Sequence, residues 1–480
     1  MLFNSIEFLL FFVLVVAIYF TIPHKYRWVL LLLSSYYFYM SWKPEYIILI
    51  MFSTLINYIT GIQIYLANTP NRKKFFLGLS IFSNIGMLFA FKYFNFFSEA
   101  ITEIVKQFSI QLQPLTLKLL LPVGISYYTF QCLSYTIDIY RGQLQPERHV
   151  GIFAVYVSFF PKLVAGPIER ATNLLPQFFE KQYFDYNRVT GGLKLMLWGF
   201  FKKAVIADRL ALTVNMVFNN VHDYNGMSLI LATFFFAFQI YCDFSGYSDI
   251  AIGSAQVLGI RLADNFNRPY FSRSISEFWK RWHISLYSWF KDYLYIPLGG
   301  NRVSVPRWYA NILIVFVVSG LWHGANWTFV VWGALHGFYL IFEIITAPLK
   351  NTVLQLSGVA RFPKVIQFIE IAFTFILVSM GWIFFRANSL SEAFYVFTHM
   401  LEGLSLSLPR DLGLGWISFM YILGMIAFME IIQALQGPAH LRQFLSDKPT
   451  LFRWLIYAAL IMLILLFGVF DEKEFIYSQF

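Results

Sequence analysis

The chain contains 480 residues, of which 58% are hydrophobic and 13% are charged, about half the charged fraction of an ordinary soluble domain. This composition excludes a soluble globular protein, because a soluble core cannot hide so much apolar surface. The formal charge of +10 indicates basic cytoplasmic loops and contact with anionic lipid head groups, and not nucleic-acid binding.

Apolar runs long enough to cross a bilayer follow one another along the chain. About twenty apolar residues span the hydrocarbon region, so the runs with their flanks predict an all-α, polytopic membrane protein of roughly 10–12 transmembrane helices. The first run follows Glu7 and has no small-x-small cleavage site, which favours a retained span over a signal peptide. The runs are Phe8–Phe20, Trp28–Met40, Tyr46–Ile59, Phe75–Phe91, Leu119–Ile137, Ser228–Tyr241, Ile312–Gly320, Phe329–Ile345, Ile366–Phe384, Ile417–Ile432 and Trp454–Phe470.

Basic clusters in the first loops set the expected orientation of the N-terminal part. His24–Arg27, Asn71–Lys74 and Arg141–Arg148 lie two spans apart, and the positive-inside rule places such clusters in the cytoplasm. The amino terminus is therefore expected outside. Beyond about residue 160, short amphipathic segments and re-entrant or interfacial helices interrupt the alternation, and the sequence predicts no topology there.

One membrane domain covering residues 1–480 is expected, because no repeat, low-complexity linker or compositional break divides the chain. Arg, Lys, Asp and Pro are concentrated in its middle, from Pro167 to Val189 and from Ile260 to Trp308. Polar residues gathered in the middle of a membrane protein indicate a site or a cavity.

The segment Tyr241–Asp249, YCDFSGYSD, interrupts an apolar run with polar side chains, among them Asp243. Gly246 permits a break in the helix at this point. Two interpretations remain open. The polar side chains line a cavity or orient a histidine, or they cap the end of a loop.

The segment Ser274–Gly300, SISEFWKRWHISLYSWFKDYLYIPLGG, is predicted to form an amphipathic helix at or just below the membrane interface. Ser274 followed by Glu277 fits a capping box. An interfacial anchor with tryptophan at the head-group level explains most of the segment, but it does not explain His283. An aromatic and apolar stripe recurs every three or four residues, at Phe278, Trp282, Leu286 and Trp289.

The segment Gly320–Gly337, GLWHGANWTFVVWGALHG, holds His323 and His336 in a strongly apolar context. Ionisable side chains inside a membrane are costly enough to indicate function; the alternative is a buried histidine that donates to a backbone carbonyl. The other histidines lie in or beside polar loops or near the end of an apolar run, where no function is indicated: His24, His149, His222, His440 and His399.

Helical geometry separates the two histidines of this segment. On one regular helix His323 and His336 lie about 140° apart and form no same-face pair, whereas His323 and Trp327 share a face. His336 is therefore predicted to be a packed or hydrogen-bonded structural residue, unless Gly324 or Gly333 breaks the helix.

Motifs of several common chemistries are missing from the sequence. Cys132 and Cys242 have no CxxC spacing, so neither a disulfide framework nor a cysteine metal site is expected. No Walker A loop, GxGxxG, GxSxG or HExxH motif occurs. What remains is histidine chemistry inside a bilayer, where a neutral imidazole takes the proton of a hydroxyl that attacks an activated acyl group.

Several long segments resemble the bacterial alginate O-acetyltransferase branch of the membrane-bound O-acyltransferase family. They occur in the same order and extend the resemblance over nearly the whole chain. It implies a helical fold that encloses a tunnel, with the acyl donor approaching from the cytoplasm and the acceptor from the outer side. The segments are PVGISYYTFQCLSYTIDIYRG, FFPKLVAGPI, GFFKKAVIADRLA, YCDFSGYSDIAIG, NFNRPYFSRSISEFWKRWHISLYSWFKDYLYIPLGGNR, LWHGANWTFVVWGALHG and the terminal FIYSQF.

The resemblance also implies roles for individual residues. His323 matches the near-invariant histidine of the family and is the expected general base, and His283 occupies a position where relatives carry His or Asn. His283 and Asn326 are expected to position the acyl carbonyl or to donate to the developing oxyanion. The other side chains expected to bind substrate are Trp282, Trp322, Trp327 and Asp243.

The expected function is O-acetylation of an exported polysaccharide such as alginate, by a multi-pass enzyme of the bacterial cytoplasmic (inner) membrane. The donor is expected to be acetyl-CoA or an acyl-carrier thioester, and no metal or bound cofactor is expected. Because a polysaccharide is too large for an intramembrane tunnel, the acyl group is expected to pass to an extracytoplasmic partner protein, which the resemblance makes an SGNH-type acetyltransferase. Membrane lipids surround the protein.

Two other functions remain open at this stage. The first is a lipid or teichoic-acid-type acyltransferase of the same family. A lateral opening of the site to lipid would favour this function. The second is a transporter that moves an acylated carrier without chemistry, which predicts inverted repeats or paired broken helices. The sequence does not decide the polymer, the acyl group, the donor or the oligomeric state.

Overall fold

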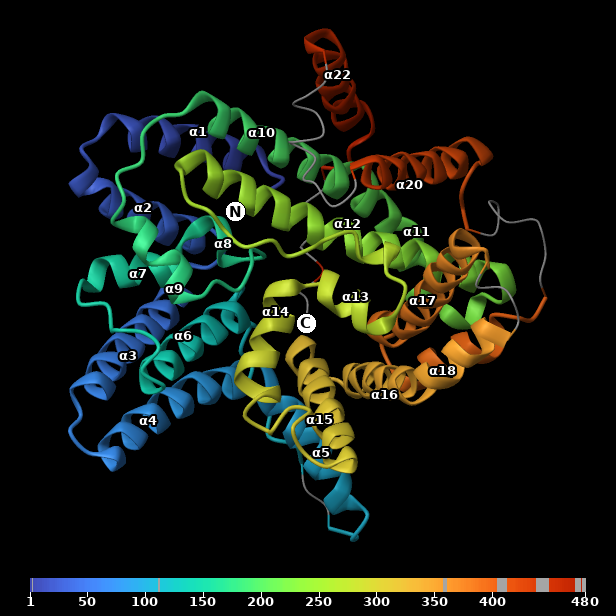
Figure 1. Ribbon diagram of the computed structural model, residues 1–480, viewed down its shortest axis with the longest axis horizontal. Helices are drawn as coiled ribbons and strands as arrows, with labels where there is room; N and C mark the ends of the chain where they lie inside the picture. The colour runs from blue at the N-terminus through green and yellow to red at the C-terminus, as the bar shows by residue number, and fades with distance from the viewer. Residues whose placement is uncertain are drawn as a thin grey trace. The chain divides into compact units, whose positions relative to one another are not determined.

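A computed structural model describes residues 1, 3–110, 113–356, 361–403, 412–436, 449–470 and 476 (Figure 1). These residues form helices, turns and connecting segments, and none of them lies in a strand. The all-α class predicted from the apolar runs is therefore confirmed.

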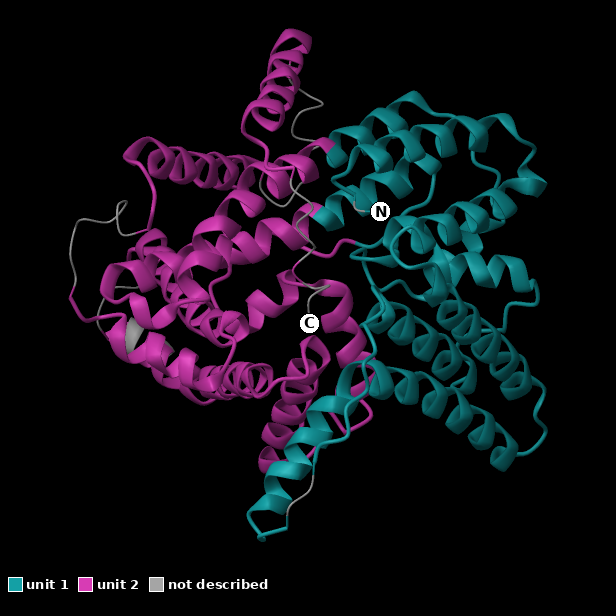
Figure 2. Ribbon diagram, turned by 180° about the vertical axis from the view of Figure 1, so that it is seen from behind, with its two compact units in different colours: residues 1–196, 247–263, 477–479 teal, residues 197–246, 264–476, 480 magenta. Residues whose placement is uncertain are grey.

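The described residues form two compact units, which Figure 2 colours separately. The first unit comprises residues 1–196 and 247–263, and the second comprises residues 197–246 and 264–476. Helices α10 (Tyr186–Phe200) and α12 (Gly226–Leu258) contribute to both units.

The other helices of the first unit are α1 (Ile6–Thr21), α2 (His24–Met40), η1 (Pro44–Tyr46), α3 (Ile47–Leu66), α4 (Pro70–Leu88), η2 (Phe89–Tyr93), α5 (Phe94–Lys106), α6 (Ile125–Tyr140), α7 (Val150–Ser158), α8 (Phe160–Leu163), α9 (Ala171–Leu174) and η3 (Pro176–Phe178). The other helices of the second unit are η4 (Phe201–Ala207), α11 (Asp208–Phe218), η5 (Val221–Asp223), η6 (Pro269–Phe271), α13 (Ile275–Arg281), α14 (Ile284–Phe290), η7 (Lys291–Tyr295), α15 (Val305–His323), α16 (Trp327–Leu356), α17 (Pro363–Arg386), α18 (Leu390–His399), α20 (Trp416–Gln436) and α22 (Thr450–Phe467). The π-helices among them are η2, η4 and η7.

Among the described residues, eight helices are long and apolar enough to cross a membrane, and the protein is a multi-pass membrane protein. This number is smaller than the ten to twelve expected, because the runs Phe8–Phe20, Trp28–Met40 and Leu119–Ile137 form the shorter helices α1, α2 and α6, of 16, 17 and 16 residues. The eight spans are Pro44–Leu66, Pro70–Lys106, Gly226–Leu258, Val305–His323, Trp327–Lys350, Pro363–Arg386, Trp416–Gln436 and Thr450–Phe467.

Polar side chains hold helices α3, α4 and α6 of the first unit together. The hydroxyl of Ser80 and the Nδ2 of Asn84, both in α4, donate to Oδ1 of Asn57 in α3 (2.8 Å and 2.9 Å). The hydroxyl oxygens of Ser80 and Thr136 lie 2.9 Å apart. All four side chains are fully buried. Because the hydrophobic effect does not drive helices together inside the hydrocarbon region, such hydrogen bonds help to fix the register of the helices relative to one another.

Helix α12 is continuous through the segment Tyr241–Asp249. The interpretation of this segment as a loop end is therefore wrong. Gly246 does not break α12 but allows the helix to pack closely against α10, since a Cβ built on it would lie 2.8 Å from the carbonyl oxygen of Gly199 in α10. The polar side chains of this segment are consequently held on a rigid helix.

Helices α15 and α16 of the second unit form a hairpin whose backbones approach closely. A Cβ built on Gly333 would fall on the carbonyl oxygen of Phe316 and lie 3.3 Å from the Cα of Gly320. A Cβ built on Gly320 would likewise fall on the carbonyl oxygen of Phe329. Small residues permit such an approach between membrane helices, so these two glycines set the distance between α15 and α16.

Replacing Gly333 with alanine is expected to destabilise the protein by about 1–3 kcal/mol, because the new methyl group forces the two backbones apart. The melting temperature of the purified protein in detergent measures this effect. Gly424→Ala in α20 is the matched control, since no atom lies within 4 Å of a Cβ built on Gly424 and alanine favours a helix by about 1 kcal/mol. Equal melting temperatures of the two variants would contradict the close-packing account.

Candidate active site

The chain reverses direction between His323 and Trp327. Helix α15 ends at His323, and Gly324 is extended, with φ −161° and ψ 148°. The Oδ1 of Asn326 then accepts a hydrogen bond from the N–H of Thr328 (3.0 Å) at the start of α16, as N-terminal capping requires. The predicted shared face of His323 and Trp327 is wrong, because no helix connects them. His323 is 3% exposed, whereas Trp327 is 51% exposed.

Aromatic rings surround His323. The centroid of its ring lies 5.0 Å from that of Trp332 in α16 and 5.4 Å from that of Phe385 in α17. The ring of the preceding residue, Trp322, lies 5.0 Å away. Such surroundings keep water away and lower the local dielectric constant, so any polar interaction of the imidazole is stronger here than in water.

His283 lies where two short helices meet. Helix α13 ends at Arg281, α14 begins at Ile284, and His283 between them has φ 44° and ψ 54°. The predicted single interfacial helix is therefore wrong at this point. Trp282, which was expected at the head-group level, is fully buried. The predicted stripe is buried inside the protein throughout, at Phe278, Trp282, Leu286 and Trp289.

Half of the capping box predicted for the start of α13 is present, because Glu277 bonds the N–H of Arg273 and not that of the N-cap Ser274. The hydroxyl of Ser274 accepts a hydrogen bond from the N–H of Glu277 (3.1 Å), and Oε2 of Glu277 accepts one from the N–H of Arg273 (2.7 Å). Oε2 of Glu343 in α16 accepts a further bond from the N–H of Ile275 (2.8 Å). This last bond anchors α13 to α16 and so fixes where the chain reaches His283.

The structure brings the two predicted catalytic histidines together. The ring centroids of His283 and His323 lie 6.4 Å apart, and that of Trp322 lies 5.8 Å from His283. Phe244 of α12 contacts His283 edge to face, with centroids 4.6 Å apart. Three segments that are distant in the sequence thus converge on one buried point of the second unit.

His336 belongs to the adjoining aromatic cluster. It is fully buried, and its ring lies 5.2 Å from that of Trp332 and 5.1 Å from that of Trp279. Gly381 in α17 leaves room for it, since a Cβ there would lie 2.7 Å from Nε2 of His336. This environment agrees with the prediction of a packed residue.

Three aromatic residues of the site were not predicted from the sequence: Trp332, Trp382 and Phe385. The indole rings of Trp332 and Trp382 stack with centroids 5.8 Å apart, and Trp382 also lies 5.0 Å from Trp282. In a chain that is 20% aromatic, nothing in the pattern distinguishes these rings from lipid-facing ones. Their role follows only from the packing of α16 and α17.

Burial lowers the pKa of His283, which lies outside the spans, from its ordinary value to about 3. The folded protein therefore keeps this residue neutral where an unfolded chain binds a proton. The free energy of unfolding is expected to decrease as the pH falls from about 6.5 towards 3.

Replacing His283 with asparagine is expected to reduce that slope by about 1 kcal/mol per pH unit between pH 6.5 and pH 5, because the unfolded histidine is only partly protonated near pH 6.5. Denaturation midpoints of both proteins between pH 6.5 and pH 5 measure the difference, and equal slopes would contradict the neutral, buried state of His283.

Asp243, predicted to bind substrate, lies in a buried ion pair. Its Oδ1 is 2.5 Å from Nζ of Lys203, which is also 2.8 Å from Oδ1 of Asp208. Lys203 and Asp208 lie five residues apart, the spacing that the π-helix η4 brings together. Sequence reasoning did not identify either partner, although both fall within the segment GFFKKAVIADRLA.

The C-terminal segment docks on the same ion pair. The N–H of Ile476 donates to Oδ2 of Asp243 (2.8 Å), and the N–H of Val469 donates to the carbonyl oxygen of Ala204 in η4 (3.0 Å). Of the terminal FIYSQF, only Ile476 is among the described residues. Asp243 thus connects η4, α12 and the C-terminal segment.

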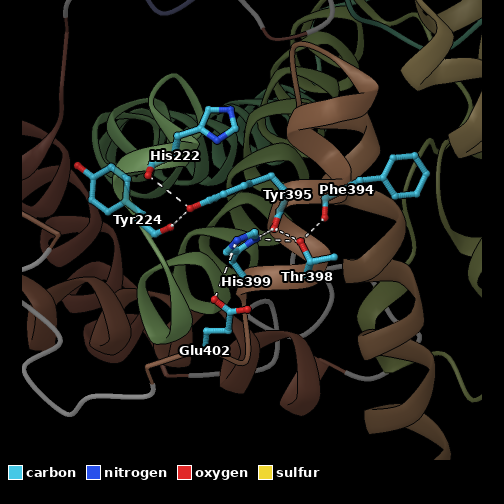
Figure 3. A network of polar contacts seen from close by, with 7 residues as sticks. All are labelled: His222, Tyr224, Phe394, Tyr395, Thr398, His399 and Glu402. Carbon is cyan, nitrogen blue, oxygen red and sulfur yellow. Dashed lines mark hydrogen bonds and ion pairs between the residues drawn. The ribbon is translucent and has the colours of Figure 1, made fainter.

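His222 and His399 belong to a polar network around Tyr395. Figure 3 shows the surroundings of His222 and His399, which contact Tyr395 with ring centroids 4.4 Å and 3.8 Å from it. Nδ1 of His399 bonds the carbonyl oxygen of Tyr395 (3.0 Å), and its Nε2 lies 4.0 Å from Oε2 of Glu402. His440 lies outside the described residues. Within the described ranges, no three His, Cys, Asp or Glu side chains are grouped to hold a metal ion.

Fold and site together define a class: a multi-pass, all-α membrane protein with two histidines packed among aromatic rings. The family model "MBOAT, membrane-bound O-acyltransferase family" matches residues 84–387, which include His283 and His323. The chain belongs to this family and is an O-acyltransferase.

Curated relatives cover most of the chain. The probable alginate O-acetylase AlgI of Pseudomonas aeruginosa is 40% identical over 404 residues, which are 84% of this chain and 75% of that protein. The probable alginate O-acetylase AlgI of Azotobacter vinelandii is 39% identical over 404 residues, 84% of this chain and 78% of that protein. A peptidoglycan O-acetyltransferase of Helicobacter pylori is 36% identical over 408 residues, 78% of this chain and 74% of that protein.

Proposed function

We propose that this protein, in the bacterial inner membrane, moves an acetyl group from a cytoplasmic thioester to a hydroxyl on the outer side, for O-acetylation of an exported polysaccharide such as alginate. The observation that carries the proposal is the buried pair of His283 and His323, with ring centroids 6.4 Å apart among aromatic side chains. No metal or bound cofactor takes part, and acetyl-CoA or an acyl-carrier thioester is the donor substrate.

In the proposed reaction, His323 is the general base. The acceptor hydroxyl gives its proton to the imidazole while its oxygen attacks the thioester carbonyl, a step for which general-base catalysis supplies about 10²–10⁴ in rate. The tetrahedral intermediate then loses the thiolate, which takes the proton back from the imidazolium. The products are an ester and a free thiol.

His283 stabilises the oxyanion in this proposal. A neutral imidazole carries one N–H that can donate to an oxygen, and burial keeps His283 neutral. A fixed donor in a dry site is worth more than one in water, because no reorganisation is needed during the reaction. Asn326 was expected from the resemblance to share this role. Its Nδ2 instead donates to the carbonyl oxygen of Asn388 (3.3 Å), and its Oδ1 caps α16, so we assign oxyanion stabilisation to His283 alone.

An excess of basic residues at one end of α15, α16 and α17 supports an acceptor site on the outer side, since five lie at that end and Arg386 lies at the other end of α17. Basic residues flank the start of α15, the end of α16 and the start of α17, at Arg302, Arg307, Lys350, Arg361 and Lys364. At the opposite ends, Nδ2 of Asn326 donates to the carbonyl oxygen of Asn388 (3.3 Å), which links the loop after His323 to the end of α17. The positive-inside rule places the basic ends in the cytoplasm, and His323 then lies towards the outer side.

The names of the relatives support a cell-surface polymer as the final acceptor. Those names specify alginate in two cases and peptidoglycan in the third, and both molecules are polysaccharide-based polymers outside the inner membrane. Because such a polymer does not enter a buried site, we propose an extracytoplasmic SGNH-type acetyltransferase as the partner that completes the transfer.

A strain that lacks this protein tests the proposal. Its exported polysaccharide is expected to release no acetate on mild base treatment, and the wild-type gene on a plasmid is expected to restore the acetate. Acetate lost from membrane lipids instead would indicate a lipid acyltransferase. Unchanged acetate in both fractions would contradict an O-acetylation function.

A further inference from the structure

His283 has a backbone conformation that few residues adopt. Its φ of 44° and ψ of 54° lie in the left-handed region, where asparagine, aspartate and histidine are several times more frequent than other non-glycine residues. A residue keeps such a conformation only where the surrounding structure enforces it. The contacts that enforce it here are therefore part of the site.

Asn265 supplies three hydrogen bonds to the two residues that follow His283. Its carbonyl oxygen accepts from the N–H of Ile284 (3.0 Å), and its Oδ1 accepts from the N–H (3.3 Å) and the hydroxyl (2.8 Å) of Ser285. Asn265 is 1% exposed and Ser285 is 5% exposed. Because water does not reach these groups, no solvent bond replaces a bond that is lost.

The two residues after Asn265 hold the other side of the break. The N–H of Asn267 donates to the carbonyl oxygen of Arg281 (2.9 Å). The ring of Phe266 packs edge-on against Trp282, with centroids 5.1 Å apart. The segment 265–267 therefore binds the chain on both sides of the left-handed residue.

We propose that Asn265 is a positioning residue for His283: by binding Ile284 and Ser285 it fixes the left-handed backbone that holds the imidazole beside His323. The inference rests on the proposed function, in which both histidines act on one acyl group. Asn265 acts on the reaction through His283.

Activity in cells tests the proposal with three variants. Asn265→Ala removes the side-chain acceptor and is expected to lower the rate of polysaccharide acetylation, at equal membrane level, about 10–100-fold, as a misplaced group near the chemistry does. Asn265→Asp keeps an oxygen at Oδ1 and replaces Nδ2, which bonds no described residue, with a second oxygen. Burial favours the neutral, protonated acid at this site, so this variant is expected to stay within about threefold of wild type. Ser285→Ala removes one bond and is expected to fall between the two.

A double-mutant cycle separates positioning from general damage. His283→Gly removes the ring and leaves an unstrained backbone. In that background, Asn265→Ala is expected to cause less than about a twofold further loss, because the group that it positions is gone. The same fold-loss in both backgrounds, or wild-type activity of Asn265→Ala, would overturn the proposal.

Chemical labelling gives a readout that does not depend on acyl transfer. Diethyl pyrocarbonate modifies accessible neutral imidazoles, and His283 at 1% exposure is expected to react slowly in the purified wild-type protein. Asn265→Ala is expected to speed labelling of His283 at least about tenfold, and Asn265→Asp is expected to leave it slow. Equal labelling in all three proteins overturns the role of Asn265, whereas missing acetylation in the wild type overturns the proposed function and leaves the labelling result interpretable.

Discussion

Replacing His323 with alanine is expected to lower the rate of acyl transfer by about 10²–10⁴-fold, while the protein remains folded in the membrane. The imidazole is the proposed general base, and the rings of Trp322, Trp332 and Phe385 around it offer no group that accepts a proton. Membrane vesicles supplied with a radiolabelled acetyl thioester measure the initial rate of transfer.

His399→Ala provides the control for this variant. Its ring is half-buried on α18 and stacks on Tyr395, with centroids 3.8 Å apart, so removing it changes one histidine without touching the buried cluster. Its rate is expected to stay within about twofold of wild type, as for most surface substitutions. A His323→Ala protein that transferred acetyl as fast as the His399→Ala protein would contradict the assignment of His323.

Replacing Asp243 with alanine is expected to destabilise the protein by about 1.5–3 kcal/mol, because it removes one of the two carboxylates that bind the buried Lys203 through charge-assisted hydrogen bonds. Lys203 is 1% exposed and would keep only the carboxylate of Asp208, 2.8 Å away, of the two that it now contacts. The N–H of Ile476 would also lose its acceptor. The melting temperature in detergent and the amount of protein in membranes measure the loss.

Asp223→Ala is the matched control for that variant. Asp223 is an exposed carboxylate in η5, so its removal is expected to change the free energy of unfolding by less than about 0.5 kcal/mol. If Asp243→Ala had the stability of this control and had lost activity alone, Asp243 would act on substrate, as the sequence suggested, and not through the ion pair.

Sequence patterns predicted the fold class and the identity of the two central histidines. Apolar runs of about twenty residues have few alternatives to spanning helices, and histidine is rare in such runs, which made His323 conspicuous. The N-cap at Ser274 was predictable because its partner, the N–H of Glu277, lies only three residues away.

The breaks in the helices were not predicted, because each depends on contacts beyond the local sequence. Phe278, Trp282, Leu286 and Trp289 fit one helical face, but segment 265–267 binds the backbone on both sides of His283 and stabilises a break there. The turn after His323 did carry a local signal, since Gly324 followed by Asn326 fits a helix end and a new N-cap. The apolar residues on either side of this signal indicated one continuous helix instead.

The pairing of Asp243 with Lys203 could not be predicted from the sequence for a similar reason. Forty residues separate the two, and only the packing of α12 against η4 brings their charges together. A carboxylate in an apolar run indicates either a substrate site or a buried ion pair, and the sequence alone does not distinguish these alternatives.

The most direct test of the central claim is the O-acetyl content of the exported polysaccharide in a strain whose only copy of this protein carries His323→Ala, with its membrane level confirmed. The account predicts that base-labile acetate falls to the level of the strain without the protein. Acetate at the wild-type level, with the variant present in the membrane, would contradict His323 as the base of the transfer.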